Sequence, residues 1–239
     1  MTAVVVCDLP VDQLISTVEQ SFDQALANRR QTNLTEPLER VPVSSPEAPF
    51  TSISRVDHSD ATLQQARLVL SWRVPGLRQL SETYAQDVVA SILGQGRTAR
   101  LVQDLRETRA LVNNIFTSNI TYGEQGVFYI AANLAIEQLD TVEAAVLEHI
   151  QRLYKEPVSE VELSRIRTQV ANRYIFSNET SSDRASMYGY YHAMTGDIEN
   201  ALNYPTAIKT VDADAVQSAV QRYLPIEAYG VLRLHPEAN

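Results

Sequence analysis

The chain has 239 residues, of which 44% are hydrophobic, and a formal net charge of −9. This length suffices for one large domain with a sizeable core, or for one domain and a fragment of another. The acidic balance argues against a nucleic-acid partner, because binding phosphate needs a basic surface. No apolar run approaches the ~20 residues of a membrane span and no secretion signal is visible, so we expect no membrane partner and a cytoplasmic location.

Residues 1–27 have the pattern of half a βα unit. The β-branched run Thr2–Cys7 predicts a buried strand, in which the single cysteine is a small buried hydrophobic side chain. The apolar spacing over Val11–Ala27 predicts an amphipathic helix. One strand and one helix cannot bury their own apolar faces, so this unit is interpreted as the tail of a preceding domain, its strand paired with an exposed sheet edge. Residues 28–49 are polar and proline-containing, which predicts an extended linker.

Residues 50–239 alternate between strands in adjacent pairs and groups of helices. Strands are predicted at Phe50–Val56, Ala66–Val74, Val112–Tyr122, Val127–Leu134 and Tyr229–Leu234. Helices are predicted at Leu80–Leu93, Thr98–Thr108, Ile136–Tyr154, Ser159–Phe176, within Glu179–Asp197, and at Asp212–Tyr223. This order predicts an α+β fold, a largely antiparallel β-sheet layered with helices. The closing strand also has the same pattern of residue types as Thr2–Pro10. A chain built from two similar halves would show such a repeat.

The segment Glu179–Asp197 holds the strongest candidate for a binding site. It begins with three good helix N-caps, Ser181–Asp183, and Gly196 can take the left-handed conformation that stops a helix. Arg184 and Tyr191 are two helical turns apart, so both side chains leave the same face. A guanidinium and a phenol at this spacing can donate to one carbonyl oxygen or to an oxyanion growing on it. The alternative is a solvated helix surface with half-buried core tyrosines.

The sequence contains no complete active site of its own. None of the four histidines, His58, His149, His192 and His235, has a second histidine at a spacing that would bind zinc. His149 follows Glu148 on a predicted helix and is interpreted as part of a surface pair. A nucleophilic serine motif is missing, and the cysteine is predicted to be buried. The sequence therefore offers no catalytic and no metal-binding residue.

Three segments together resemble the insulinase/pitrilysin family of zinc metallopeptidases, in the group typified by mitochondrial processing peptidase. The first is the strand–turn–helix of residues 1–14. The second is the run Ile92–Val112, which contains Leu-Gly-x-Gly-x-x-x-Arg-Leu and a following Leu-Arg-Glu. The third is the remainder of the chain, in which the spacing to the helix of Glu179–Asp197 and to the closing strand also matches. The resemblance implies the half-domain fold of that group, in which two homologous halves enclose a chamber. It also implies that Arg184 and Tyr191 match the pair that reaches from a second half to hold substrate beside the zinc.

The inverted His-x-x-Glu-His zinc motif of the family is absent from this sequence. The resemblance therefore implies a tail of a preceding homologous half at residues 1–27, a linker at 28–49 and a C-terminal peptidase-like domain at 50–239. This would be the substrate-clamping half of a zinc-dependent endopeptidase, inactive alone and binding no cofactor itself. Its partners would be a peptide substrate and a zinc-bearing homologous half or subunit, forming a dimer. The rival interpretations are a non-catalytic scaffold of the same fold, like the core proteins of a respiratory complex, and an unrelated α+β peptide-binding module.

Overall fold

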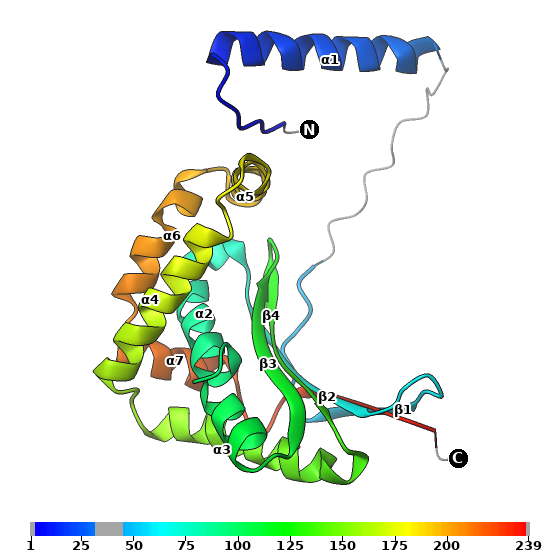
Figure 1. Ribbon diagram of the computed structural model, residues 1–239, viewed down its shortest axis with the longest axis vertical. Helices are drawn as coiled ribbons and strands as arrows, with labels where there is room; N and C mark the ends of the chain where they lie inside the picture. The colour runs from blue at the N-terminus through cyan, green and yellow to red at the C-terminus, as the bar shows by residue number, and fades with distance from the viewer. Residues whose placement is uncertain (1–2, 32–44, 238–239) are drawn as a thin grey trace.

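The computed structural model describes residues 3–31 and 45–237, and from residue 54 onward the chain forms a five-stranded sheet with helices on one face (Figure 1). The strands are β1 (Ser54–Ser59), β2 (Ala66–Pro75), β3 (Val112–Thr121), β4 (Gln125–Leu134) and β5 (Gly230–His235). The α-helices are α1 (Val11–Gln31), α2 (Leu80–Gly94), α3 (Leu139–Lys155), α4 (Glu160–Phe176), α5 (Ser181–Thr195), α6 (Glu199–Thr210) and α7 (Ala213–Tyr223). The predicted α+β fold is confirmed.

The order of strands across the sheet is β1-β5-β2-β4-β3. Three of the neighbouring pairs are antiparallel, and only β1 and β5 run parallel. A parallel pair cannot be joined by a tight hairpin, so the chain crosses the whole domain between these two strands. The sheet is therefore largely antiparallel, as predicted, although the first strand begins at Ser54 rather than Phe50.

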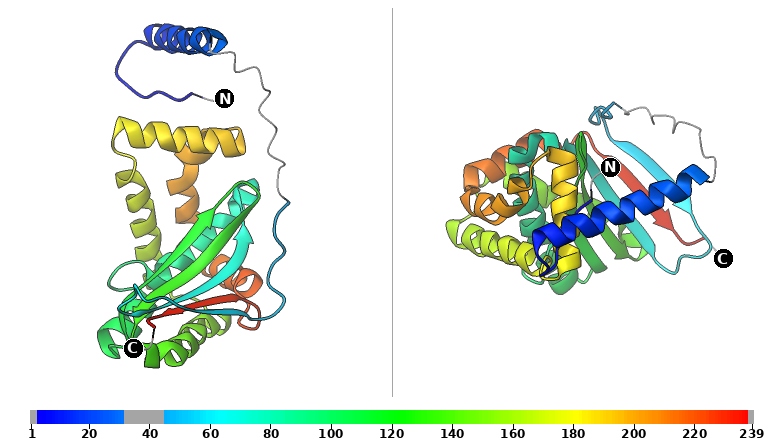
Figure 2. Two further views of the ribbon diagram at one scale, coloured as in Figure 1. Left: turned by 90° about the vertical axis from the view of Figure 1, so that its right-hand side faces the viewer. Right: turned by 90° about the horizontal axis from the view of Figure 1, so that it is seen from above.

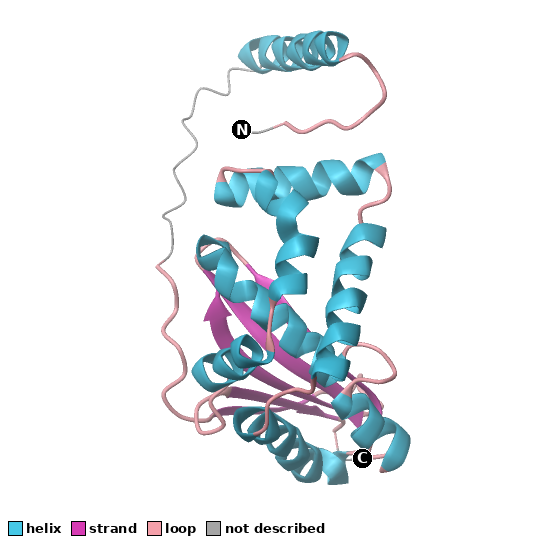
Figure 3. Ribbon diagram, turned by 90° about the vertical axis from the view of Figure 1, so that its left-hand side faces the viewer, coloured by secondary structure: helices cyan, strands magenta, loops and turns pink. Residues whose placement is uncertain are grey.

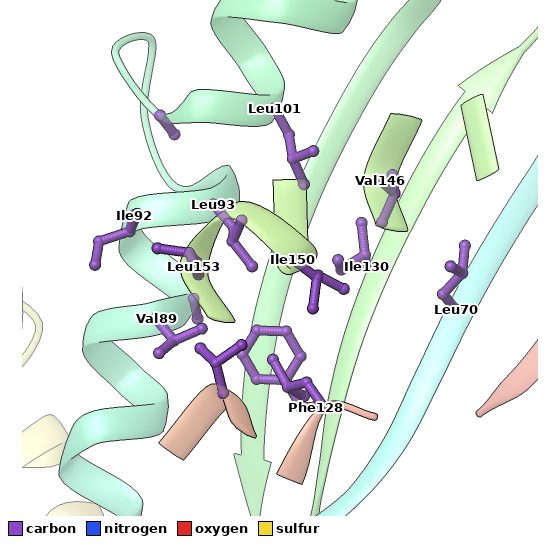
Figure 4. Packing of buried hydrophobic residues seen from close by; sticks show 14 of the residues in the cluster. Leu70, Val89, Ile92, Leu93, Leu101, Phe128, Ile130, Val146, Ile150 and Leu153 are labelled. Carbon is purple, nitrogen blue, oxygen red and sulfur yellow. The ribbon is translucent and has the colours of Figure 1, made fainter. Parts of the chain in front are cut away.

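The core lies between the sheet and the helices α2, α3 and α7 (Figure 4). Alternate residues of β2 and β4 are buried, as the period of two in their sequences requires. Trp72 is at the centre: its ring packs edge-on to Phe128 and tilted on Tyr229, and its indole N–H donates to the Pro225 carbonyl at 2.9 Å. This bond satisfies the one polar atom of a side chain that is otherwise fully buried.

A second layer of helices stands on the first. Helices α4 and α6 lie side by side and pack against α2, and α5 crosses over their ends (Figure 3). The predicted bounds of α4 and α7 are correct within one residue, because Ser159 and Asp212 each cap a helix start with the side-chain oxygen. The segment that follows Gly96 differs from prediction, since Val102–Thr108 forms a wider π-helix instead of an α-helix.

The predicted strand at Thr2–Cys7 is wrong for its described residues, since residues 3–7 form no strand. They run beside α5, with Val4 against Gly189, and find no neighbouring strand to bond with (Figure 2). Cys7 is consequently exposed, not buried. The following helix α1 extends to Gln31, beyond the predicted end at Ala27, and most of its apolar residues are exposed. Within residues 3–31 and 45–237, no helix is long and apolar enough to cross a membrane.

One carboxylate fastens the parallel edge of the sheet to the helix layer. Glu143 of α3 is buried, accepts both Nη atoms of Arg55 at 2.6 and 2.7 Å, and accepts the Tyr229 hydroxyl at 2.9 Å. Arg233 of β5 donates to the same group. Burial alone would raise the pKa of Glu143, but the hydrogen bonds from Arg55, Arg233 and Tyr229 outweigh it and lower the pKa to about 2.

We expect Glu143→Gln to lower the free energy of unfolding at pH 7 by about 3 kcal/mol, because it leaves two arginines without their shared carboxylate. The folded-state pKa lies below the usual value of 4.5. The difference from the wild type should therefore be complete above about pH 4.5 and disappear as the pH falls through about 2. Urea titrations at several pH values would measure this.

The matched control is Glu124→Gln, which breaks an ion pair with Arg78, a side chain that is 70% exposed. This variant should change stability by less than about 1 kcal/mol. Equal losses in the two variants at pH 7 would contradict the role given to Glu143.

Candidate functional site

Helix α5 is held at both ends by local signals. Its N-cap is Thr180, whose hydroxyl accepts from the backbone N–H of Asp183 at 3.1 Å, one residue before the predicted caps. Its C-cap is Gly196, as predicted, with a left-handed φ of 79°. A third anchor comes from Tyr190, whose hydroxyl donates to the Thr121 carbonyl at the end of β3. The helix is thus fixed over the upper end of the domain.

The two predicted binding residues lie on the side of α5 that faces the domain. Tyr191 is only 8% exposed and lies against Tyr174 of α4. Arg184 is exposed, and its Nε donates to the Asn178 carbonyl at 3.1 Å, just beyond the end of α4. No hydrogen bond joins Arg184 to Tyr191 in the described part of the chain.

A pocket of about 190 Å³ has Tyr174, the residue that Tyr191 lies against, in its wall, and we call it the Asp87 pocket. Its walls come from α2, β3, α4 and α6 and comprise Asp87, Ser91, Gln95, Asn119, Val170, Arg173, Tyr174, Ser177 and Tyr204. Tyr174 contacts Tyr191, and Ser177 precedes the residue to which Arg184 is bonded. Arg184 and Tyr191 therefore approach two lining residues of one pocket.

Asp87 lies at the junction of three elements. One carboxylate oxygen accepts from the Asn119 amide at 2.8 Å, and the other accepts from the Tyr204 hydroxyl at 2.7 Å. Burial raises the pKa of Asp87 to about 6, and the two hydrogen bonds only partly offset this. The carboxyl group is surrounded by protein yet reaches solvent through the pocket.

Stacked tyrosines connect this carboxylate to α5. The rings of Tyr174 and Tyr204 stack with centroids 4.3 Å apart. Burial raises the pKa of Tyr174 to about 12 and that of Tyr191 still further. The nearby Tyr174 contributes to the raised pKa of Tyr191. The Tyr174 hydroxyl donates to the Ala201 carbonyl at 2.9 Å, which holds the ring that Tyr191 lies against.

The histidines do not combine into a metal site. Among residues 3–31 and 45–237, no group of three or more His, Cys, Asp or Glu side chains could hold a metal ion. The prediction of a surface position for His149 is wrong: this side chain is 6% exposed and bonded to Asp104 at 2.9 Å, because α3 packs against the π-helical segment. The described residues therefore offer no set of ligands for zinc. The resemblance implies zinc only in another half or subunit.

The Asp87 pocket was not foreseen from the sequence, although one signal was present. Asp87 interrupts the apolar face of α2, where Val88 and Val89 are fully buried. An acidic residue between core positions of a buried helix marks a functional or paired carboxylate more often than a surface one. Its partners Asn119 and Tyr204 are distant in sequence and carry no local pattern.

Comparisons with known proteins give a consistent result. The family model described as the peptidase M16 inactive domain matches residues 1–170. A curated relative, an uncharacterized zinc protease of Rickettsia bellii, is 28% identical over 158 residues, which cover 66% of this chain and 38% of the relative. The chain spans about half the length, or less, of the curated relatives it matches.

Two solved structures show the same fold at low sequence identity. A protease from Helicobacter pylori superposes with a TM-score of 0.80 at 16% identity, covering 97% of this chain and 54% of that one. A chain of complex III2 from Candida albicans superposes with a TM-score of 0.70 at 19% identity, covering 87% of this chain and 51% of that one.

We expect Asp87→Asn to fold and to be at least as stable as the wild type at neutral pH, because an amide and a rotated Tyr204 hydroxyl can keep both hydrogen bonds. The folded-state pKa of Asp87 lies above its usual value of 3.8. The wild type should therefore lose up to about 3 kcal/mol of stability relative to the variant as the pH rises from about 4 to about 6. Paired urea titrations would show this, and a difference that stays constant over this range would contradict it.

Proposed function

Because the chain belongs to the family of peptidase M16 inactive domains, we propose that it is the substrate-holding C-terminal half of a zinc-dependent endopeptidase. The zinc would be supplied by another half of a longer chain or by a partner subunit, and the two would form a dimer of homologous halves. In this proposal the chain contributes no catalytic residue and is inactive alone. The expected cytoplasmic location stays a prediction.

The observation that carries this proposal is the arrangement of Arg184 and Tyr191 on α5. From the same helix, Tyr191 lies against the pocket residue Tyr174, and Arg184 donates to the carbonyl of Asn178, the residue after the pocket residue Ser177. Arg184 uses only Nε in its bond to Asn178, so its two Nη groups stay available as donors. Donors of this kind on one face of a helix suit the carbonyl oxygens of an extended peptide.

The phenol of Tyr191 and the guanidinium of Arg184 would have different roles in binding the peptide. The raised pKa of Tyr191 keeps the phenol protonated, so it is a donor at every physiological pH. The guanidinium presents a planar fork that can bind a peptide carbonyl or a developing oxyanion. Because both groups address the peptide backbone, they would hold many sequences equally well and leave selectivity to other residues.

Residues 1–27 are proposed to be the tail of a preceding homologous half. Helix α1 exposes apolar side chains along one stripe, with Val11 68% and Ile15 50% exposed, and nothing in residues 45–237 covers them. An amphipathic helix of this kind is stable when its apolar face packs on another element. A preceding half would supply that element, and a sheet edge for Ala3–Cys7.

The alternative is a non-catalytic scaffold of the same fold, and the similarity to a chain of complex III2 supports it. Membership of the peptidase family excludes the third interpretation, an unrelated α+β module. A scaffold gives no reason for a guanidinium and a phenol at two-turn spacing on α5, so the pair Arg184 and Tyr191 favours the substrate-holding role.

We expect Tyr191→Phe and Arg184→Lys to lower peptide turnover in the assembly that contains the zinc-bearing half. Tyr191→Phe keeps the ring and removes one donor, for which about a 10²-fold loss is typical when the donor faces the transition state. A fall in kcat and kcat/KM together would indicate action in the transition state, and a rise in KM alone would indicate ground-state binding. Steady-state kinetics with a fluorogenic peptide would separate the two.

Tyr188→Phe is the matched control, because Tyr188 lies on the same helix but outside the two-turn spacing of Arg184 and Tyr191. It should leave turnover nearly unchanged. If Tyr191→Phe and Arg184→Lys also leave turnover unchanged, the substrate-holding role is refuted and the scaffold remains.

A further expectation concerns the purified chain by itself. It should contain no stoichiometric zinc and cleave no peptide, because the histidines and carboxylates of the part that the structure describes form no suitable donor set. Elemental analysis showing close to one zinc per chain, together with cleavage that a chelator abolishes, would overturn this expectation.

A further inference from the structure

The wall of the Asp87 pocket holds two opposite charges that are not paired with each other. The Asp87 carboxylate of α2 accepts hydrogen bonds only from the neutral side chains of Asn119 and Tyr204. The Arg173 guanidinium of α4 donates to the neutral side chain of Gln95. In the part of the chain that the structure describes, neither charge forms an ion pair with any residue. A carboxylate surrounded by protein is normally paired, so this one lacks a cation that its own pocket does not supply.

Hydrogen bonds along α2 keep the two charges apart. Asp87, Ser91 and Gln95 follow one another at intervals of about one turn and all line the pocket. The Ser91 hydroxyl donates to Gln95 Oε1 at 2.8 Å, and the same oxygen accepts from Arg173. The guanidinium is therefore held near the turn of Ser91, about 6 Å further along the helix axis than Asp87. A ligand that bridges this gap by one hydrogen bond at each end needs a cation and an anion close together.

A third polar atom of the wall has no hydrogen-bond partner. Asn119 lines the pocket, and its Oδ1 atom is buried without a donor, while its amide nitrogen is bonded to Asp87 at 2.8 Å. Buried acceptors in folded proteins are normally satisfied. An ammonium group carries three N–H donors, so one such group can serve Asp87 and Asn119 Oδ1 together.

The size and the apolar lining of the pocket restrict the ligand further. A volume of about 190 Å³ lies below the range of about 300–1,000 Å³ typical of sites for drug-sized ligands. The apolar part of the wall comes from Val170 and the rings of Tyr174 and Tyr204. Among the described residues, no cluster of three His, Cys, Asp or Glu side chains could hold a metal ion. The ligand that fits is a small organic zwitterion.

We propose that the Asp87 pocket binds a free α-amino acid as its zwitterion. In an amino acid, the ammonium and carboxylate groups are attached to the same carbon, as the short gap requires. Asp87 and Asn119 Oδ1 accept from the ammonium group, and Arg173 donates to the carboxylate through guanidinium N–H groups that it does not use for Gln95. The side chain of the amino acid lies against the apolar part of the wall, which favours an apolar side chain.

This site goes beyond the proposed function and does not depend on it. Neither Arg184 nor Tyr191 lines the pocket, so the amino acid does not occupy the place proposed for a peptide. The site also lies entirely within α2, β3, α4 and α6, so it is complete without a zinc-bearing half.

The test measures amino-acid binding to the 239-residue chain itself. The probes are L-leucine, N-acetyl-L-leucine, which lacks the ammonium group, and L-leucinamide, which lacks the carboxylate. NMR titrations of the chain should show saturable binding of leucine. Both analogues should bind at least about tenfold more weakly, because each leaves one charged group of the pocket without its partner.

Variants of the pocket assign the two ends of the ligand. Asp87→Asn and Arg173→Gln should each weaken leucine at least about tenfold. Arg173→Gln should not weaken leucinamide, which offers no carboxylate to lose. The matched control is Arg165→Gln, because Arg165 is exposed on the same helix but bonded to Thr98, outside the pocket. This control should bind leucine as the wild type does, and urea titration checks that every variant is folded.

Several outcomes would overturn the proposal. Leucinamide binding as tightly as leucine would make the pocket a plain cation site, and N-acetyl-leucine binding as tightly would make it an anion site. Full affinity for leucine in folded Asp87→Asn or Arg173→Gln would show that the amino acid binds elsewhere. The absence of saturable leucine binding at millimolar concentration would refute the site outright.

Discussion

One carboxylate joins the elements that lie beneath α5. Asp87 joins α2 to β3 through Asn119 and to α6 through Tyr204. Tyr204 stacks on Tyr174 of α4, and Tyr174 lies against Tyr191 of α5. Five elements therefore meet in one cluster of side chains. The residues that would hold substrate are attached to the core of the domain through this cluster, and not through a loop.

The domain uses two buried carboxylates in opposite ways. Glu143 is enclosed by arginines and has a pKa of about 2, whereas Asp87 has only neutral donors and a pKa of about 6. A paired carboxylate contributes to stability and stays ionised at neutral pH. An unpaired one reduces stability at neutral pH, which is tolerable when the group serves binding. The same residue class thus gives a structural anchor at one place in the domain and lines a pocket at another.

The elements of residues 50–239 could be predicted because their signals are local. Alternation in β2 and β4 and the side-chain caps at Ser159 and Asp212 each depend on a few neighbouring residues. The strand at Thr2–Cys7 failed because a strand exists only with a partner, and its sequence cannot show whether one is in reach. Arg184 and Tyr191 were found by helical spacing, but the pocket below them joins residues 87, 119 and 204. No local pattern could bring these three together.

The parallel pairing of β1 with β5 has a consequence for how the domain is made. This pair joins Ser54 to Gly230, near the two ends of the domain, so it closes nearly the longest loop that the domain allows. Contacts of such sequence separation cost the most chain entropy and form slowly. During synthesis, β1 emerges first and must wait for β5, the last strand of the chain. We therefore expect the antiparallel β2–β4–β3 portion to assemble early, with the edge of β2 unpaired and open to aggregation until the C-terminal residues arrive.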